Sequence, residues 1–124
     1  MRNLLLVAAG GAIGSMLRWG LSGAVQRWTD SPFPWGTFAV NAMGSLAVGF
    51  VAAVALERAL VSPAVRLFSI VGVLGGFTTF SAFSYETLAL LRDGQWLSAV
   101  GYAGGSVVVG VMAALVGYAF GMKL

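Results

Sequence analysis

Long apolar stretches separated by short polar segments make up the whole chain. The apolar stretches run over about residues 3–25, 35–57, 66–91 and 96–122. The segments between them, "QRWTDSPFP", "ERALVSPAVR" and "RDGQ", carry charges and turn-forming residues. A helix needs about 20 apolar residues to cross a bilayer, and in lipid a segment of this length must satisfy its own backbone as a helix. The pattern therefore predicts an all-α integral membrane protein, a single domain over residues 1–124 with four transmembrane helices.

The composition supports lipid as the solvent. The chain is 59% hydrophobic and only 9% charged, whereas a soluble domain has about 25% charged residues. The absence of cysteine and histidine excludes disulfides, thiolate metal sites and a histidine base. The net charge of +3 includes no basic run, so no nucleic-acid partner is expected. The first stretch begins like a signal peptide, but its length and Arg18 favour a retained helix over cleavage.

The charges flanking the helices give only a weak orientation signal. Short loops predict antiparallel neighbours, and four spans place both termini on one side. The other side carries Arg27 and Arg92, plus Arg18 if it reaches that surface. Such a small imbalance permits insertion in both orientations. The positive residues on the terminal side are Arg2, Arg58, Arg66 and Lys123.

Small and polar residues recur every four positions and so share a helix face. Packing between helices is the favoured interpretation of the glycines, because small residues let backbones approach closely. For Asn41, a wide polar amide near mid-span, a functional role is favoured. The rows are Gly10/Gly14/Arg18, Thr37/Asn41/Ser45/Gly49 and Tyr102/Ser106/Gly110, with the pairs Gly101/Gly105 and Gly117/Gly121.

The segment "GGFTTFSAFS", residues 75–84, differs from the other apolar stretches. Its glycine pair follows Gly72 by one turn and predicts a kinked or unwound third helix near mid-span. Carbonyls freed there could coordinate a small cation. Beyond the pair, Phe80, Phe83 and Ser84 share one face, with Thr79 at its edge. From the residues alone, this face is either an ion path or a phenylalanine-packed core whose hydroxyls bond to their own helix.

At this segment the sequence resembles a known family. "GGFTTFSAFSYE" is similar to the third-helix signature of the small bacterial fluoride channels, the Fluc or CrcB family. "GGAIGSMLRW", "PWGTFAVNAMGSLAVG" and "GYAGGSVVVG" resemble the motifs of its other three helices, in the same order. The departures are Ala82, where threonine is common, and Gly110, where some members have serine.

The resemblance implies a passive fluoride channel in the bacterial inner membrane, which lowers cytoplasmic fluoride and is not an enzyme. It also implies an antiparallel, dual-topology homodimer with two pores. One central sodium ion would be held by backbone carbonyls of Gly75 and Thr78 from both subunits. Arg18 would belong to an anion-attracting vestibule, and Glu86 to the far end of a polar track. The fluoride paths would be lined by Asn41, Thr79, Phe80, Phe83, Ser84 and Ser106, with Tyr102 nearby.

These side chains suit a strongly hydrated anion. Hydroxyls and amide N–H groups are donors, and phenylalanine has a positive ring edge. Conduction needs several weak sites rather than one tight one. Two alternatives remain. A small four-helix proton-coupled exporter would need a membrane carboxylate, for which Glu86 is the candidate, and a structural subunit would transport nothing.

Overall fold

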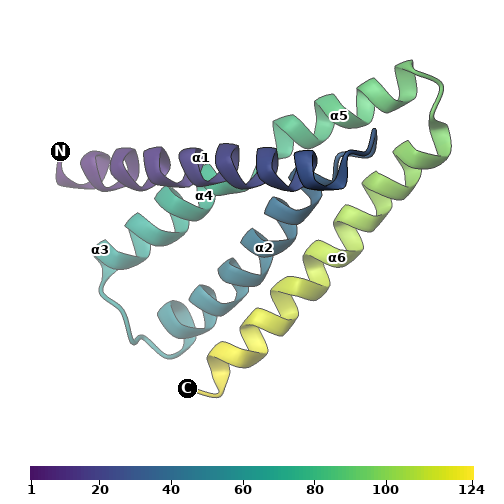
Figure 1. Ribbon diagram of the computed structural model, residues 1–124. Helices are drawn as coiled ribbons and strands as arrows, with labels where there is room; N and C mark the ends of the chain where they lie inside the picture. Colours follow the sequence, from purple (N-terminus) through teal and green to yellow (C-terminus); the bar gives the residue numbers. More distant parts are fainter.

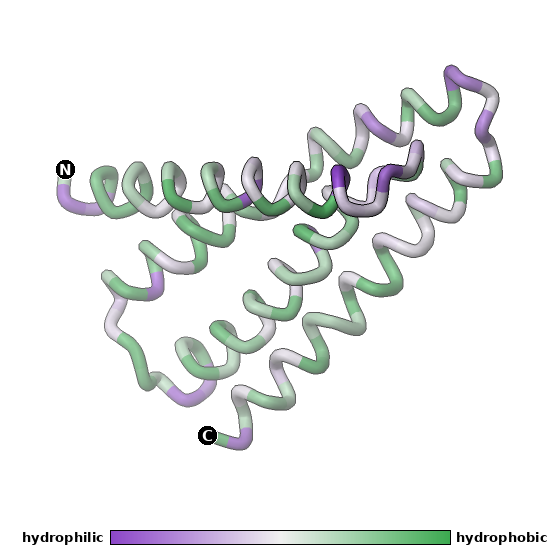
Figure 2. The backbone as a smooth tube through the Cα atoms, viewed as in Figure 1, coloured by the Kyte–Doolittle hydropathy of each residue, from purple (hydrophilic) through white to green (hydrophobic).

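The computed structural model describes residues 1–124 as helices joined by short loops (Figure 1). Four helical segments are long and apolar enough to cross a membrane, which confirms the predicted all-helical membrane fold. The apolar colouring of Figure 2 runs along these segments, and polar residues gather at their ends. The elements are α1 (Arg2–Thr29), α2 (Trp35–Ala52), η1 (Ala53–Glu57), α3 (Pro63–Arg66), η2 (Leu67–Leu74), α4 (Gly75–Phe77), α5 (Phe80–Arg92) and α6 (Trp96–Met122).

Two helix ends differ from the sequence pattern. The first helix continues through residues 26–29, which were expected in a loop, and it ends where Asp30 adopts the left-handed conformation (φ 45°). The third span begins at Pro63 rather than near residue 66. The Ser62 hydroxyl caps this start by accepting from the Val65 N–H at 3.3 Å, and proline suits the first helical position.

The loop between the first two spans is organised by one side chain. The Gln26 amide nitrogen donates to the carbonyls of Ser31 and Phe33 at 2.7 and 3.1 Å, and its oxygen accepts from the Gly36 N–H at 3.0 Å. The bond to Gly36 satisfies an N–H at the start of α2, where a helix has no internal partners, and the other two hold the loop before it. Gln26 therefore fixes how the second span leaves the first.

Glycines set the close contacts between helices. α2 packs along α6, and α1 packs against η2 and α4 (Figure 1). A methyl group on Gly49 would overlap the carbonyl of Ala114, and one on Gly117 that of Leu46. A methyl on Gly14 would likewise meet Val73. The packing interpretation is confirmed for these glycines, whereas Gly101 has no neighbour near its Cβ position in the single chain.

We expect Gly117→Ala to destabilise the subunit, because its methyl would displace the α2 backbone. Overpacking of this kind costs typically about 1–3 kcal/mol. The matched control is Gly104→Ala on the same helix, where a Cβ meets nothing within 4 Å and alanine gains up to about 1 kcal/mol of helix propensity. Thermal unfolding in detergent measures both. A Gly117→Ala protein that unfolds at the wild-type temperature would contradict the packing assignment.

The backbone of the third span changes conformation at two threonines rather than at the glycine pair. Gly75 is helical (φ −63°, ψ −37°), whereas Thr78 and Thr79 have extended ψ values of 153° and 117°. We call these two residues the extended threonine pair. β-Branched residues favour extended backbone. Gly76 instead serves close packing, because a methyl there would approach the Gly11 carbonyl to 2.6 Å.

Candidate functional site

A pocket of about 410 Å³ opens beside the extended threonine pair. It draws residues from α2, η2, α4, α5 and α6, and none of them is charged. Most of the side chains expected along a fluoride path meet here, whereas Ser84, Tyr102 and Arg18 are not among the lining residues. The pocket is lined by Asn41, Gly44, Ser45, Val48, Ile70, Leu74, Gly75, Thr78, Thr79, Phe80, Phe83, Ser106 and Val107.

Asn41 forms a reciprocal pair of hydrogen bonds with Thr79. Its Nδ2 donates to the Thr79 carbonyl at 3.1 Å, and its Oδ1 accepts from the Thr79 N–H at 2.8 Å. In an uninterrupted helix that N–H would donate to the carbonyl of Gly75. The pairing therefore deprives Gly75 of its helical partner. It also leaves the second hydrogen of Nδ2 free to donate to a ligand.

Arg18 acts on the neighbouring carbonyl. Its Nε donates to the Gly76 oxygen at 3.0 Å, and its side chain is half-buried. In a continuous helix the Gly76 carbonyl would accept a hydrogen bond from the Phe80 N–H. The two extended residues move that N–H away from it. Gly75 and Gly76, two of the carbonyls at the interruption, therefore have different surroundings. Gly76 is satisfied by a cation on α1, and Gly75 lines the pocket.

The hydroxyls of the site differ in their hydrogen-bond partners. Those of Thr78 and Ser84 donate to carbonyls of their own segment, Leu74 at 3.0 Å and Phe80 at 2.9 Å, so for these two the self-bonded interpretation is correct. The Thr79 Oγ1 accepts from the Ala82 N–H at 3.2 Å and caps α5. The Ser106 hydroxyl is buried with no hydrogen-bond partner. An orphaned buried hydroxyl is rare, and here it borders a pocket.

Two phenylalanines form the aromatic wall of the pocket. Phe80 is 79% exposed in the single chain, and its ring centroid lies 5.6 Å from that of Phe83. Phe83 also packs against Tyr102 at 5.2 Å. Phe77 does not line the pocket and packs instead on the Gly44 face of α2. The extended threonine pair between Phe77 and Phe80 therefore separates Phe80 and Phe83 from Phe77.

A polar cluster lies behind Phe83. The carboxylate of Glu86 accepts a hydrogen bond from the Thr37 hydroxyl at 2.8 Å and another from the Tyr102 hydroxyl at 2.7 Å. Tyr102 is fully buried. The sequence had suggested roles for Glu86 and Tyr102 but none for Thr37. The signal was present, since Thr37 precedes Asn41 by one helical turn on the same face.

Comparison with known proteins gives matches over nearly the whole chain. Residues 5–118 match the sequence model of the family described as CrcB-like protein, Camphor Resistance (CrcB). The chain is 53% identical to a fluoride-specific ion channel FluC of Thermus thermophilus, over 100% of this chain and 98% of that protein. It is 45% identical to the protein of the same name from Chloroflexus aurantiacus, over 98% and 96% of the two chains. With the Rhizobium meliloti protein the identity is 44%, over 96% and 95%.

Proposed function

Since this chain belongs to the CrcB-like family, we propose that it works as a fluoride-specific ion channel. It is a multi-pass bacterial membrane protein and not an enzyme. As a passive channel it would let fluoride leave the cytoplasm and so reduce fluoride toxicity.

The buried Ser106 hydroxyl, which has no hydrogen-bond partner, is the observation that best supports the pocket as the fluoride site. It borders an uncharged pocket together with the free N–H of Asn41 and with Thr79, whose hydroxyl accepts from the Ala82 N–H and lies 3.3 Å from the Ser81 hydroxyl. Fluoride must exchange its hydration for such donors. The Phe80 and Phe83 rings can add their positive edges. Several neutral donors bind an anion weakly enough for it to move on.

Fluoride efflux from proteoliposomes tests the function. Vesicles loaded with potassium fluoride and diluted into fluoride-free buffer, with valinomycin to carry the counter-ion, should release fluoride rapidly to an external electrode. Vesicles loaded with chloride should release almost none if the chain shares the selectivity that its relatives' name, fluoride-specific ion channel, states. Protein-free vesicles give the background. Equal fluoride and chloride rates would refute the assignment.

No feature favours the proton-coupled exporter. Its one candidate carboxylate, Glu86, does not line the pocket and is already engaged by two hydroxyls.

We propose further that the channel is an antiparallel homodimer. A single subunit buries only 16 of its 124 residues, so most of its apolar surface needs lipid or protein to cover it. The pocket is open, and Phe80 stands exposed at its edge. A second copy would close the pocket, and the weak charge bias allows that copy to insert inverted.

A sodium ion at the dimer centre is part of the same proposal. The Gly75 carbonyl has lost its helical donor, and Thr78 lies on the same pocket wall. Carbonyl oxygens at such interruptions suit Na⁺. One subunit contributes too few ligands for such an ion, so carbonyls of both subunits would hold it. The positive charge of the ion would attract backbone carbonyls of both third spans and so hold the two subunits together.

Labelling of an introduced cysteine tests the inverted arrangement, because the natural chain has no cysteine. Asn3→Cys places a thiol near the terminal surface. In intact cells a membrane-impermeant maleimide should label one part of the protein, and the remainder should react only after permeabilisation. Adding two lysines to the terminal side should bias the orientation and lower fluoride efflux. Complete labelling from one side alone would exclude dual topology.

A further inference from the structure

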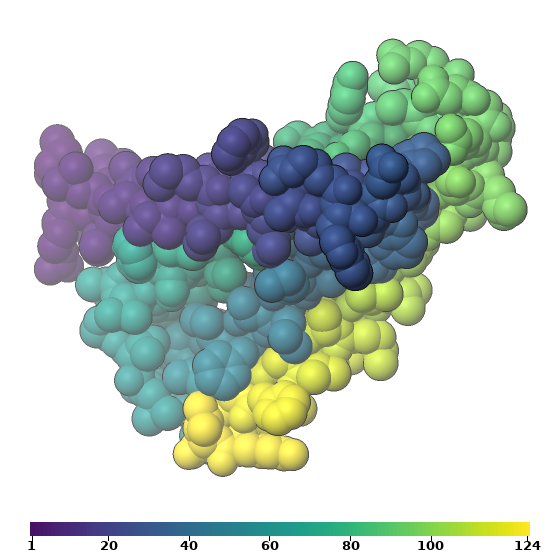
Figure 3. Space-filling model, in the orientation of Figure 1, coloured from purple at the N-terminus to yellow at the C-terminus, as the bar shows by residue number.

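A second pocket of about 410 Å³ lies apart from the ion site, where α1 and the third span begin. The N-terminal part of α1 packs over η2, and the two segments lie side by side in Figure 3. Since both spans begin here, the pocket opens at one surface of the membrane. Ile70 is the one residue that also lines the pocket beside the extended threonine pair. The pocket is lined by Arg2, Asn3, Pro63, Ala64, Arg66, Leu67, Ile70 and Val71.

The mouth of this pocket is positively charged. Arg2 comes from α1 and Arg66 from α3, and no acidic residue lines the pocket. Arg2 is exposed and Arg66 half-buried. Two guanidinium groups without a carboxylate partner favour an anion with several oxygens, which they can bind through paired N–H donors.

Apart from Asn3, the remaining walls of the pocket are apolar. Leu67, Ile70 and Val71 continue from the arginines into the part of the third span that crosses the membrane. Val71 is 55% exposed. A small soluble anion would gain nothing from such walls, whereas a lipid would place its acyl chain along them.

We propose that this pocket binds the headgroup of an anionic phospholipid, with its phosphodiester between Arg2 and Arg66. A net negative lipid is favoured over a zwitterionic one, because the pocket has no carboxylate to pair with a lipid ammonium group. Basic pockets between helices at a membrane surface are suited to this chemistry. The site does not depend on fluoride conduction.

Lipid retention by the purified protein tests the proposal. Protein in detergent is mixed with equal amounts of phosphatidylglycerol and phosphatidylcholine, and the bound lipids are counted by native mass spectrometry. We expect phosphatidylglycerol to be enriched. The enrichment should fall about fivefold for each of Arg2→Gln and Arg66→Gln, and roughly 25-fold for the double variant, since each basic residue near the surface contributes about equally.

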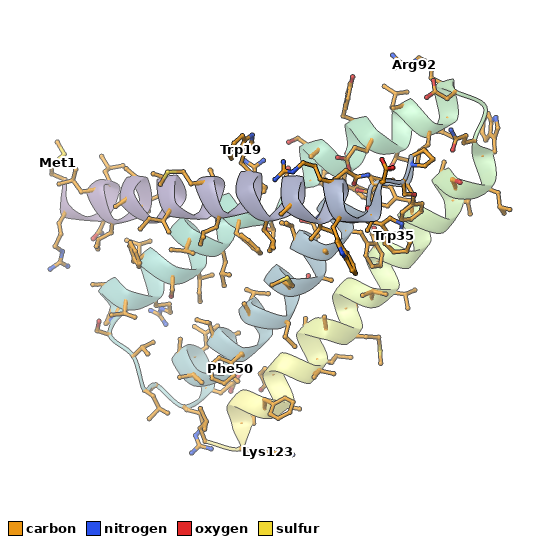
Figure 4. The ribbon with its side chains drawn as sticks, in the orientation of Figure 1. Met1, Trp19, Trp35, Phe50, Arg92 and Lys123 are labelled. Carbon is orange, nitrogen blue, oxygen red and sulfur yellow. The ribbon has the colours of Figure 1, made fainter.

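The matched control is Arg27→Gln with Arg92→Gln, which removes the same charge from exposed positions at the other end of the molecule, where Arg92 lies far from Met1 (Figure 4). This control should retain its preference. Equal enrichment in the Arg2/Arg66 double variant would overturn the proposal, as would equal loss in the control. Displacement of the lipid by millimolar inorganic phosphate would overturn it too, because it would indicate a site for free anions.

Discussion

Replacing Phe80 or Phe83 with isoleucine is expected to remove most fluoride conduction without unfolding the protein. Isoleucine keeps an apolar side chain at the pocket wall but has no positive ring edge. If the ring edge lowers the barrier by about 2.7 kcal/mol, its loss slows flux on the order of 100-fold. Phe80 is the cleaner position, because it is 79% exposed and contributes little to the fold of a single subunit. Fluoride efflux from proteoliposomes gives the rate.

Phe77→Ile is the matched control for this prediction. Phe77 lies on the Gly44 face of α2 rather than at the pocket, so its variant should conduct at nearly the wild-type rate. Gel filtration shows whether each variant keeps its assembly. Normal flux through folded Phe80→Ile and Phe83→Ile proteins would mean that the two rings are packing residues. A selective loss in Phe77→Ile would mean that the helix phase differs in the assembled channel.

Asn41→Leu is expected to affect both conduction and stability. The change removes both hydrogen bonds to Thr79, and each backbone group left buried without a partner costs about 1–3 kcal/mol. It also removes the free amide N–H from the pocket. Fluoride efflux should fall to the vesicle background, and the unfolding temperature in detergent should drop.

Gln95→Leu loses a similar amide at a position where the side chain caps no helix, and it should behave as wild type in both assays. Wild-type efflux through Asn41→Leu would show that the amide neither binds the ion nor holds the extended threonine pair. A lower unfolding temperature with full efflux would mean that Asn41 only holds the extended threonine pair and does not bind the ion.

The sequence was enough to place the spans, because in lipid the length of an apolar stretch decides where a helix crosses. The interhelical role of Gly14, Gly49 and Gly117 also followed from their spacing. The position of the extended residues did not. Glycine propensity pointed to Gly75 and Gly76, but the decisive interaction is the pair of hydrogen bonds between Thr79 and Asn41, 38 residues apart in the sequence. Tertiary contacts of this kind override local preference.

The hydroxyl partners could not be predicted either. Ser84 and Ser106 both lie on faces that suit an ion path, and only the folded chain distinguishes them. Ser84 donates to its own helix, whereas the Ser106 hydroxyl is buried without a partner. The hydrogen bond from Arg18 to Gly76 could not be predicted from the sequence either. It joins a side chain of the first span to a carbonyl exposed by an interruption in the third.

The pairing of Asn41 with Thr79 also bears on how the third span enters the membrane. The second span leaves the ribosome before the third, so Asn41 is already synthesised when the two threonines enter the insertion machinery. An extended segment with free N–H and C=O groups is poorly soluble in lipid by itself. We therefore expect the third span to leave the translocon beside the second, so that Asn41 can pair with the Thr79 backbone as it enters the lipid. On this reasoning the second and third spans are expected to insert as a pair rather than independently.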